Sequence, residues 1–178
     1  TTKGEEKNWT QFKEDVYQKL EKITNKAKRQ GPMYIMGDWN ARMQKAQNKT
    51  ERTVFGKWTL EPDKARVQEL SEDVTWNRDR CIEFCLKQKL VLTNTRFKKT
   101  KEKTATFRTP GTLETEEIEL KKHEQIDYIA VQQRWKNTIT DAESNTKANL
   151  DTDHYPVTAT CRIKLRATHN KKGPGRKK

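Results

Sequence analysis

The stretch Gly37-Asp-Trp-Asn-Ala41 follows directly on the apolar run Met33-Tyr-Ile-Met36. An apolar run of this length predicts a buried strand, and the acidic and amide side chains behind it then begin a loop. Similar junctions recur later, where Gln125-Ile-Asp-Tyr-Ile129 begins an apolar run and Asp153-His154 precedes the run from Val157 to Leu165. Polar side chains thus gather where three predicted strands begin or end.

In this order the three motifs resemble the active site of the endonuclease/exonuclease/phosphatase superfamily. They are most similar to the apurinic/apyrimidinic-endonuclease-like domain of LINE-type (non-LTR) retrotransposons. The resemblance runs from about Trp9 to Leu165, and it includes Thr104-Ala-Thr-Phe-Arg-Thr-Pro-Gly111, which is similar to the Thr-Trp/Phe strand of the family. A single motif of this kind is common in proteins, so the resemblance depends on the ordered set.

The resemblance implies a role for each motif residue in the hydrolysis of a phosphodiester, which needs an activated water and neutralisation of charge on the phosphate. Asp38 would activate water or protonate the leaving oxygen, and Asn40 would hydrogen-bond a phosphate oxygen. His154 would contact the phosphate or act as an acid/base, Asp127 would orient its ring, and Asp153 would help to bind Mg²⁺ or Mn²⁺. Taken singly, these residues are equally typical of turns, strand starts and loops.

The resemblance covers only part of the family's domain. Fewer than forty residues precede Asp38, and they read as one helix and one strand. In the family this motif follows a half that supplies the main metal-binding glutamate, so no such glutamate can be assigned. We expect an α/β (α+β) fold, the C-terminal half of a four-layer α/β/β/α sandwich, with one mostly antiparallel mixed sheet and helices on one face. Another chain would then cover the exposed sheet face.

Three functional hypotheses follow. The chain is the C-terminal half of a metal-dependent DNA endonuclease that another chain completes. Alternatively, it is a catalytically silent, domesticated subunit that binds nucleic acid or supports a large assembly such as a ribonucleoprotein. In the third hypothesis it is an active but reduced nuclease with an altered metal site. The family acts on DNA, RNA and small phosphoesters, and the resemblance to retrotransposon domains favours DNA nicking.

The composition favours an anionic partner. Lys and Arg number 38 against 25 Asp and Glu, which gives a net charge of +13. Because basic residues that neutralise phosphates release counterions, nucleic acid is the simplest partner, with DNA favoured and RNA possible. Mean hydropathy of −1.19 is low for a packed core, but the apolar residues are clustered with clear periodicity, which indicates a folded domain.

Basic residues concentrate in two segments. Residues 96–103 are predicted to form a loop between strands, and residues 167–178 form a basic tail that is flexible by composition. We therefore divide the chain into a domain at 1–166 and a tail at 167–178. The first segment is equally typical of a solvated loop, and the second of a localisation signal or an expression remnant. The candidate nucleic-acid contacts are Arg96, Lys98, Lys99, Arg108, Lys171, Lys172 and Arg176.

The rest of the chain reads as alternating helices and strands. Helices are predicted at 9–27 and 78–89, and strands at 33–36, 90–94, 104–108, 125–131, 135–140 and 157–165. The apolar stripe of the first helix, which should face a sheet, consists of Trp9, Phe12, Val16, Leu20, Ile23 and Ala27. Strict alternation in the last strand predicts one buried face, formed by Val157, Ala159, Cys161, Ile163 and Leu165.

The cysteines indicate a reducing compartment. Cys81 and Cys85 share one helix face and Cys161 lies on the apolar side of the last predicted strand, so all three read as core residues rather than a disulfide or zinc set. We expect an intracellular location, with the nucleus favoured and an organelle possible. No apolar run approaches the roughly eighteen residues that a membrane span needs.

Residues 42–76 form a long polar segment with little periodicity. Two aromatic residues in it, Phe55 and Trp58, allow two interpretations. Either Trp58 stacks on a base or sugar of a nucleic acid, or both rings pin the segment to the core.

Overall fold

The computed structural model describes residues 3–27, 31–61, 72–112, 118–148 and 150–164. The helices are α1 (Lys3–Ala27), α2 (Glu51–Val54) and α4 (Glu72–Gln88), and short 3-10 helices are η1 (Thr93–Thr95), η2 (Lys101–Lys103) and η3 (Gln133–Thr138). The strands are β1 (Tyr34–Asp38), β2 (Leu90–Leu92), β3 (Phe107–Arg108), β4 (His123–Glu124), β5 (Asp127–Gln132), β6 (Ile139–Ser144) and β7 (Val157–Cys161).

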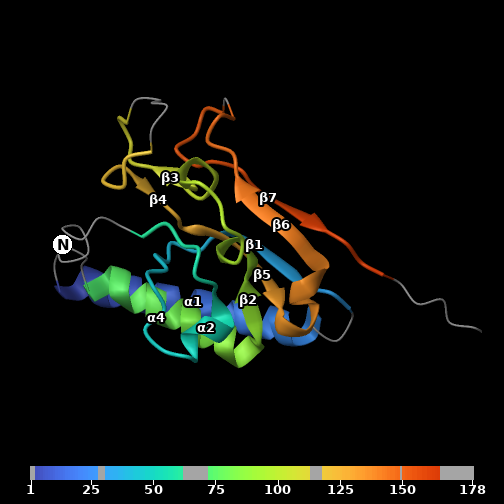
Figure 1. Ribbon diagram of the computed structural model, residues 1–178. Coiled ribbons are helices and arrows are strands. Elements are labelled where there is room, and N and C mark those ends of the chain that lie inside the picture. The colour runs from blue at the N-terminus through green and yellow to red at the C-terminus, as the bar shows by residue number, and fades with distance from the viewer. Residues whose placement is uncertain (1–2, 28–30, 62–71, 113–117, 149, 165–178) are drawn as a thin grey trace, which may run out of the picture.

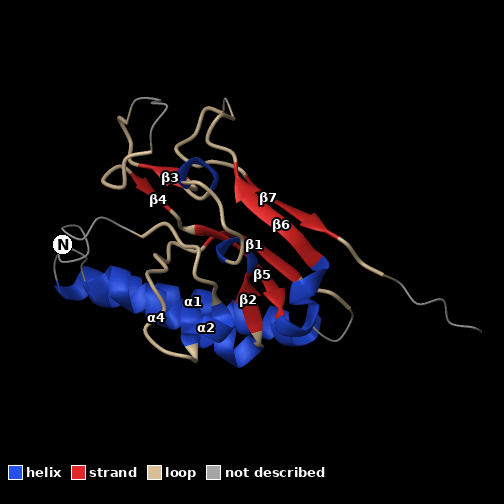
Figure 2. Ribbon diagram, in the orientation of Figure 1, coloured by secondary structure: helices blue, strands red, loops and turns tan. Residues whose placement is uncertain are grey.

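The main sheet has the strand order β1-β5-β2, and β5 is antiparallel to both neighbours. Alternate residues of β5 pack on opposite sides: Tyr128 and Ala130 lie in the core with α1 and α4, whereas Ile129 and Val131 pack against β6. The helices α1 and α4 therefore lie on one side of the central sheet, and the β6–β7 hairpin lies on the other (Figure 1). The predicted α/β class with antiparallel strands is confirmed, and β3–β4 and β6–β7 form two further two-stranded sheets (Figure 2).

The helical side of the core depends on α4. Cys81, Phe84 and Cys85 are fully buried there, so the predicted core role of both cysteines is confirmed. The ring of Tyr17 from α1 lies 5.8 Å from that of Phe84, and the ring of Trp39 lies 5.9 Å from it on another side. A hydrogen bond with Cys81, together with burial, raises the pKa of the Cys85 thiol. Among the described helices, none is long and apolar enough to cross a membrane.

The predicted apolar stripe of α1 is only partly correct. Leu20 and Ala27 pack on the core, but Phe12, Val16 and Ile23 are 58%, 40% and 64% exposed. The core contact instead shifts to a neighbouring line of the helix that includes Tyr17 and Thr24. Because α4 and β1 cover only this narrower line, the rest of the stripe faces outward. The side chain of Trp9 lies outside the described residues.

Two strand predictions near the C-terminus need correction. Gln133–Thr138 forms a 3-10 helix, so the predicted strand at 135–140 begins only at Ile139. The alternation in β7 does not produce a buried face, since Ala159 and Cys161 are exposed and only Val157 is half-buried. Among the described strands β7 pairs with β6 alone, and its residues from Thr158 to Cys161 are exposed. Ile163 is likewise exposed, and Leu165 lies outside the described residues.

Candidate active site

The antiparallel register of β1 and β5 brings two predicted site residues together. β1 ends at Asp38 and β5 begins at Asp127, and these two residues are directly paired. Side chains of directly opposed residues project from the same face of a sheet, so the two carboxylates are neighbours. Burial raises the pKa of the Asp127 carboxyl, and the charge of Asp38 adds to this effect.

His154 lies beside these two carboxylates, and Asp38, Asp127 and His154 together form the group at the centre of the candidate site. Its Nδ1 lies 3.1 Å from Oδ2 and 3.3 Å from Oδ1 of Asp127. Hydrogen bonds from Thr106 and His154 oppose part of the rise in the pKa of the Asp127 carboxyl. The ring is 38% exposed, whereas the Asp127 carboxylate is only 16% exposed. An imidazole that is held through Nδ1 leaves Nε2 free to face solvent or a ligand.

The strand β3 holds His154 in this position. The Arg108 amide donates to the Asp153 carbonyl at 2.9 Å, and the Tyr155 amide donates to the Thr106 carbonyl at 2.8 Å. Between these two bonds, Phe107 and His154 form a β-bridge, and the Phe107 ring meets the imidazole edge-on at a centroid distance of 5.0 Å.

Two supporting residues were not predicted from the sequence. Thr106 Oγ1 accepts hydrogen bonds from the amides of Ile126 and Asp127, at 2.9 and 3.0 Å. Asn94 donates from Nδ2 to the Asp127 carbonyl at 3.0 Å and accepts from the Ile129 amide at 3.2 Å. The only sequence signals were a threonine in the segment that resembles the family and an asparagine behind an apolar run.

The Asp38–Asn40 segment is a tight turn fixed to α4. The Asn40 amide donates to Asp38 Oδ1 at 2.7 Å, and Asn40 has a φ of 49°, in the left-handed region that asparagine tolerates. Nδ2 of Asn77 donates to the carbonyls of Trp39 and Asn40 at 2.9 and 2.8 Å, while Tyr17 donates its hydroxyl to Asn77 Oδ1 at 3.1 Å. Asp38 and Asn40 themselves remain exposed at the surface.

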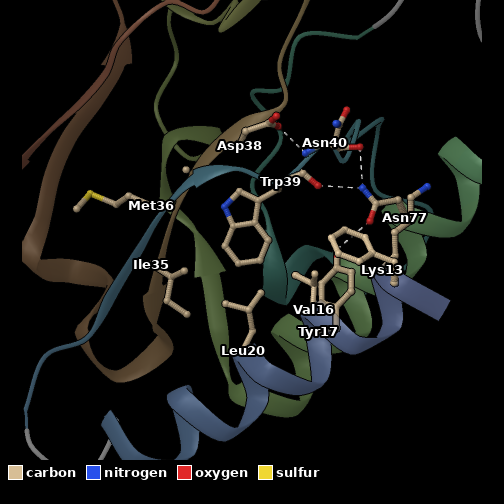
Figure 3. Close-up of a pocket in the computed structure, with 12 residues that line it drawn as sticks. Lys13, Val16, Tyr17, Leu20, Ile35, Met36, Asp38, Trp39, Asn40 and Asn77 are labelled. Atoms are coloured by element: carbon tan, nitrogen blue, oxygen red, sulfur yellow. Dashed lines mark hydrogen bonds between the residues drawn. The ribbon is translucent and has the colours of Figure 1, made fainter. Parts of the chain in front are cut away.

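An apolar groove leads up to this turn, between α1 and β1 (Figure 3). Its volume is about 530 Å³. Val16 and Leu20 of α1 and Ile35 of β1 form its walls, and Asp38 and Asn40 lie at its polar end. A further apolar residue of the groove, Met36, is 68% exposed.

The predicted metal ligand Asp153 lies beside the group but not in a cluster of acids. Its carboxylate is 43% exposed and lies 3.8 Å from Nε of Arg108. Among the residues that the structure describes, no group of three or more His, Cys, Asp or Glu side chains could hold a metal ion. These residues therefore do not form a complete Mg²⁺ or Mn²⁺ site by themselves.

The predicted nucleic-acid contacts have different surroundings. Arg96 and Lys98 are exposed. Lys99 donates to Asp141 at 2.8 Å and to Glu143 at 2.7 Å, and these carboxylates raise its pKa. Arg108 approaches Asp153. The tail residues Lys171, Lys172 and Arg176 lie outside the described part of the chain.

This arrangement of helices and antiparallel strands is an α/β fold that is also found in an apurinic/apyrimidinic endonuclease. The AP endonuclease LMAP from Leishmania major matches 86% of this chain with a TM-score of 0.53 and 15% sequence identity. This chain in turn covers 43% of that endonuclease. At this identity the match shows a shared fold.

Two curated relatives share sequence with nearly the whole chain. Craniofacial development protein 2 of Bos taurus is 30% identical over 168 residues, and that of Tragulus javanicus is 29% identical over 168 residues. Each alignment covers 93% of this chain but 24% of the relative, so the chain spans about a quarter of the length of the relatives that it matches. No protein-family model matches the chain.

Proposed function

We propose that this chain is part of a metal-dependent phosphodiester hydrolase of the DNA-endonuclease type, derived from a retrotransposon-type nuclease. The observation that carries the proposal is the bond of His154 Nδ1 to Asp127, beside Asp38 on the paired strand. The fold that the chain shares with an AP endonuclease supports it. DNA is the favoured substrate, and the net charge of +13 suits a polyanion.

Each residue of the group has a chemical task in this proposal. Asp127 holds the imidazole through Nδ1, so that Nε2 of His154 contacts a phosphate oxygen or transfers a proton. Asp38, exposed beside it, takes a proton from the attacking water or gives one to the leaving oxygen. The side-chain amide of Asn40 hydrogen-bonds a second phosphate oxygen.

Mg²⁺ or Mn²⁺ belongs to the proposal as a cofactor. When bound, the ion would neutralise charge on the phosphate. Asp153 would supply one oxygen ligand, and the others would come from polypeptide outside the described residues, because the described ones hold no complete ligand set. The tasks of Asp38, Asp127 and His154 do not involve the ion.

We also propose that further polypeptide covers the outer edge of β1 and the groove beside it. Among the described strands β1 pairs with β5 only, and an unpaired edge accepts an added strand. The exposed side chains of Phe12, Val16 and Met36 would then be buried. Such a cover would carry its own polar groups to the vicinity of Asp38. A nuclear location is part of the same proposal.

The test is nicking of supercoiled plasmid by the purified chain with Mg²⁺, with an EDTA control. Asp38→Ala and His154→Ala are expected to abolish nicking, whereas Asp151→Ala, which removes an exposed acid close to His154 in sequence, should retain it. Nicking that survives both of the first two variants would overturn the assignment of the site.

A second candidate function is a catalytically silent, nucleic-acid-binding or structural subunit of a larger assembly such as a ribonucleoprotein. The position of Asp153, beside Arg108 rather than within a cluster of acids, favours it. In that case the chain binds nucleic acid in a salt-sensitive manner and leaves the plasmid intact in Mg²⁺ and in Mn²⁺.

A further inference from the structure

We propose that Trp58, together with Lys57, Arg96 and Lys98, forms a second nucleic-acid contact, which stacks a base of a single strand beside the candidate active site. This inference rests on the proposed function for its class of ligand. It adds a binding subsite on a different segment, and it does not depend on catalysis.

The segment that carries Trp58 is fixed at both ends. Phe55 forms a parallel β-bridge with Leu92, and the Gly56 amide donates to Thr95 Oγ1 at 2.8 Å. The Trp58 amide donates to the Thr95 carbonyl at 3.0 Å, and the Leu60 amide donates to Gln125 Oε1 at 3.1 Å. A ring on such a segment is positioned before a ligand arrives, which lowers the entropic cost of binding.

The two aromatic residues of this segment have different roles. Phe55 is 1% exposed and belongs to the core, so it pins the segment. Trp58 is only partly buried and carries two ammonium groups: Lys57 Nζ lies 4.6 Å and Lys98 Nζ 5.6 Å from its ring centroid. An indole face that holds cations at the surface is also a face on which a base can stack.

The basic residues around the Trp58 ring differ from neighbouring lysines in whether they form ion pairs with carboxylates. Lys99 and Lys103 donate to carboxylates, Asp141 and Glu143 for the first and Glu143 for the second. Within the part of the chain that the structure describes, by contrast, Lys57, Arg96 and Lys98 form no ion pair with a carboxylate. Their charges are therefore available to the phosphates of a strand whose base rests on Trp58.

One short element connects this contact to the candidate active site. In η1, Asn94 bonds the Asp127 carbonyl, and the next residue, Thr95, bonds the amides of Gly56 and Trp58. A strand that reaches the group around Asp127 therefore has the Trp58 segment close by. A single-stranded ligand is the better fit, because the bases of a duplex are stacked on each other and leave no free face.

The experiment measures binding of a fluorescently labelled oligothymidylate by anisotropy at low salt, with EDTA to prevent cleavage. Trp58→Ala is expected to weaken binding about tenfold, the change expected for the loss of one stacked base. Trp58→Phe should retain most of the affinity. The matched control is Trp135→Ala, which removes another partly buried indole with an adjacent cation, Arg134 at 5.8 Å, and should change the affinity less than twofold. Urea unfolding of each variant confirms that it is folded.

Equal binding by wild type and Trp58→Ala would overturn the inference, as would equal weakening by Trp58→Ala and Trp135→Ala. An equal loss of affinity for duplex DNA would also overturn it, since it would indicate a general charge effect. The outcome is separate from that of the plasmid test. Trp58-dependent binding without nicking rejects catalysis by this chain on its own and keeps the subsite, whereas nicking with Trp58-independent binding rejects the subsite and keeps catalysis.

Discussion

At the scale of single residues, the ionised Asp127 carboxylate lowers the stability of the fold and is proposed to orient His154. Burial raises its pKa, so the folded protein holds the carboxyl proton more tightly than the unfolded chain does. The stability that the protonated form contributes is present below the ordinary Asp value of about 3.9, and it is lost as pH rises through the folded-state pKa. The ionised carboxylate that orients His154 at neutral pH is therefore present at the expense of stability.

We predict that Asp127→Asn separates these two effects. The neutral amide removes the cost of ionisation, so at pH 7.5 the free energy of unfolding of the variant should equal or exceed that of wild type. The difference should shrink as the pH is lowered towards 4.5. Urea unfolding at several pH values measures it, with Asp151→Asn as the exposed control. A variant that is less stable than wild type at pH 7.5, by a margin that grows with pH, would contradict the argument.

Gly56 lies where the backbone of its segment approaches η1 most closely. A Cβ at this position would meet the Thr95 carbonyl oxygen at 2.3 Å and Arg96 Cα at 2.8 Å. Both are backbone atoms and cannot rotate away. We predict that Gly56→Ala lowers the free energy of unfolding by about 1–3 kcal/mol, measured by urea denaturation. Lys57→Ala, on the adjacent exposed residue, should change it by less than about 0.5 kcal/mol.

At the scale of elements, the positions of the strands were easier to predict from the sequence than the faces of the strands that are buried. The apolar runs before Asp38 and after Asp127 are strands, as expected. The alternation from Val157 also predicts a strand, yet Cys161 is exposed, because periodicity shows which face is apolar and not which element covers it. Phe12 belongs to the predicted apolar stripe of α1 and is exposed for the same reason. A buried face depends on a neighbour that lies elsewhere in sequence.

The candidate site also contains residues that the sequence predicts and residues that only the structure reveals. Asp38, Asp127 and His154 could be predicted because their motifs lie where apolar runs begin or end and follow the order of the family that they resemble. The structure brings the three residues together. Thr106 and Asn94 support Asp127 through hydrogen bonds to its backbone. Such bonds join residues that are distant in sequence and leave no periodic pattern, so only the three-dimensional arrangement reveals them.

The Arg80 guanidinium of α4 forms ion pairs with two glutamates of α1. Arg80 donates to both carboxylate oxygens of Glu14, at 2.8 and 3.0 Å, and lies 3.5 Å from Glu21. The hydrogen bonds that Arg80 donates lower the pKa of Glu14, and the same bonds raise the pKa of Arg80. We predict that Arg80→Ala lowers the free energy of unfolding by about 1.5–3 kcal/mol, the range for hydrogen bonds to charged groups.

The pH dependence tests the origin of this loss. Because the pKa of Glu14 is lowered, its contribution is present above the ordinary Glu value of about 4.3 and is lost as pH falls through the folded-state pKa. The deficit of Arg80→Ala relative to wild type should therefore be largest near pH 7 and smaller at pH 3. Arg80→Lys keeps the charge but not the paired bonds, and should fall between the two. A deficit independent of pH would assign the loss to packing instead.

At the scale of the whole molecule, the groove beside β1 is an apolar surface next to a strand edge with which no other described strand pairs. Phe12, Val16 and Met36 line it with exposures of 58%, 40% and 68%. Exposed apolar patches at open sheet edges favour association. The purified chain should therefore self-associate as its concentration rises, unless another polypeptide occupies this surface.

We predict that Phe12→Glu combined with Met36→Lys keeps the chain monomeric in sedimentation velocity at concentrations where wild type associates. Both side chains are largely exposed, so the free energy of unfolding should change by less than about 1 kcal/mol for the pair. Ile23→Glu is the matched control: Ile23 is 64% exposed on the same helix but does not line the groove, so this variant should associate as wild type does. Each of the three changes replaces an exposed apolar side chain with a charged one, so the variants differ in whether the changed residue lines the groove. A wild-type chain that stays monomeric, or an Ile23→Glu variant that also loses association, would show that the groove is not an interface.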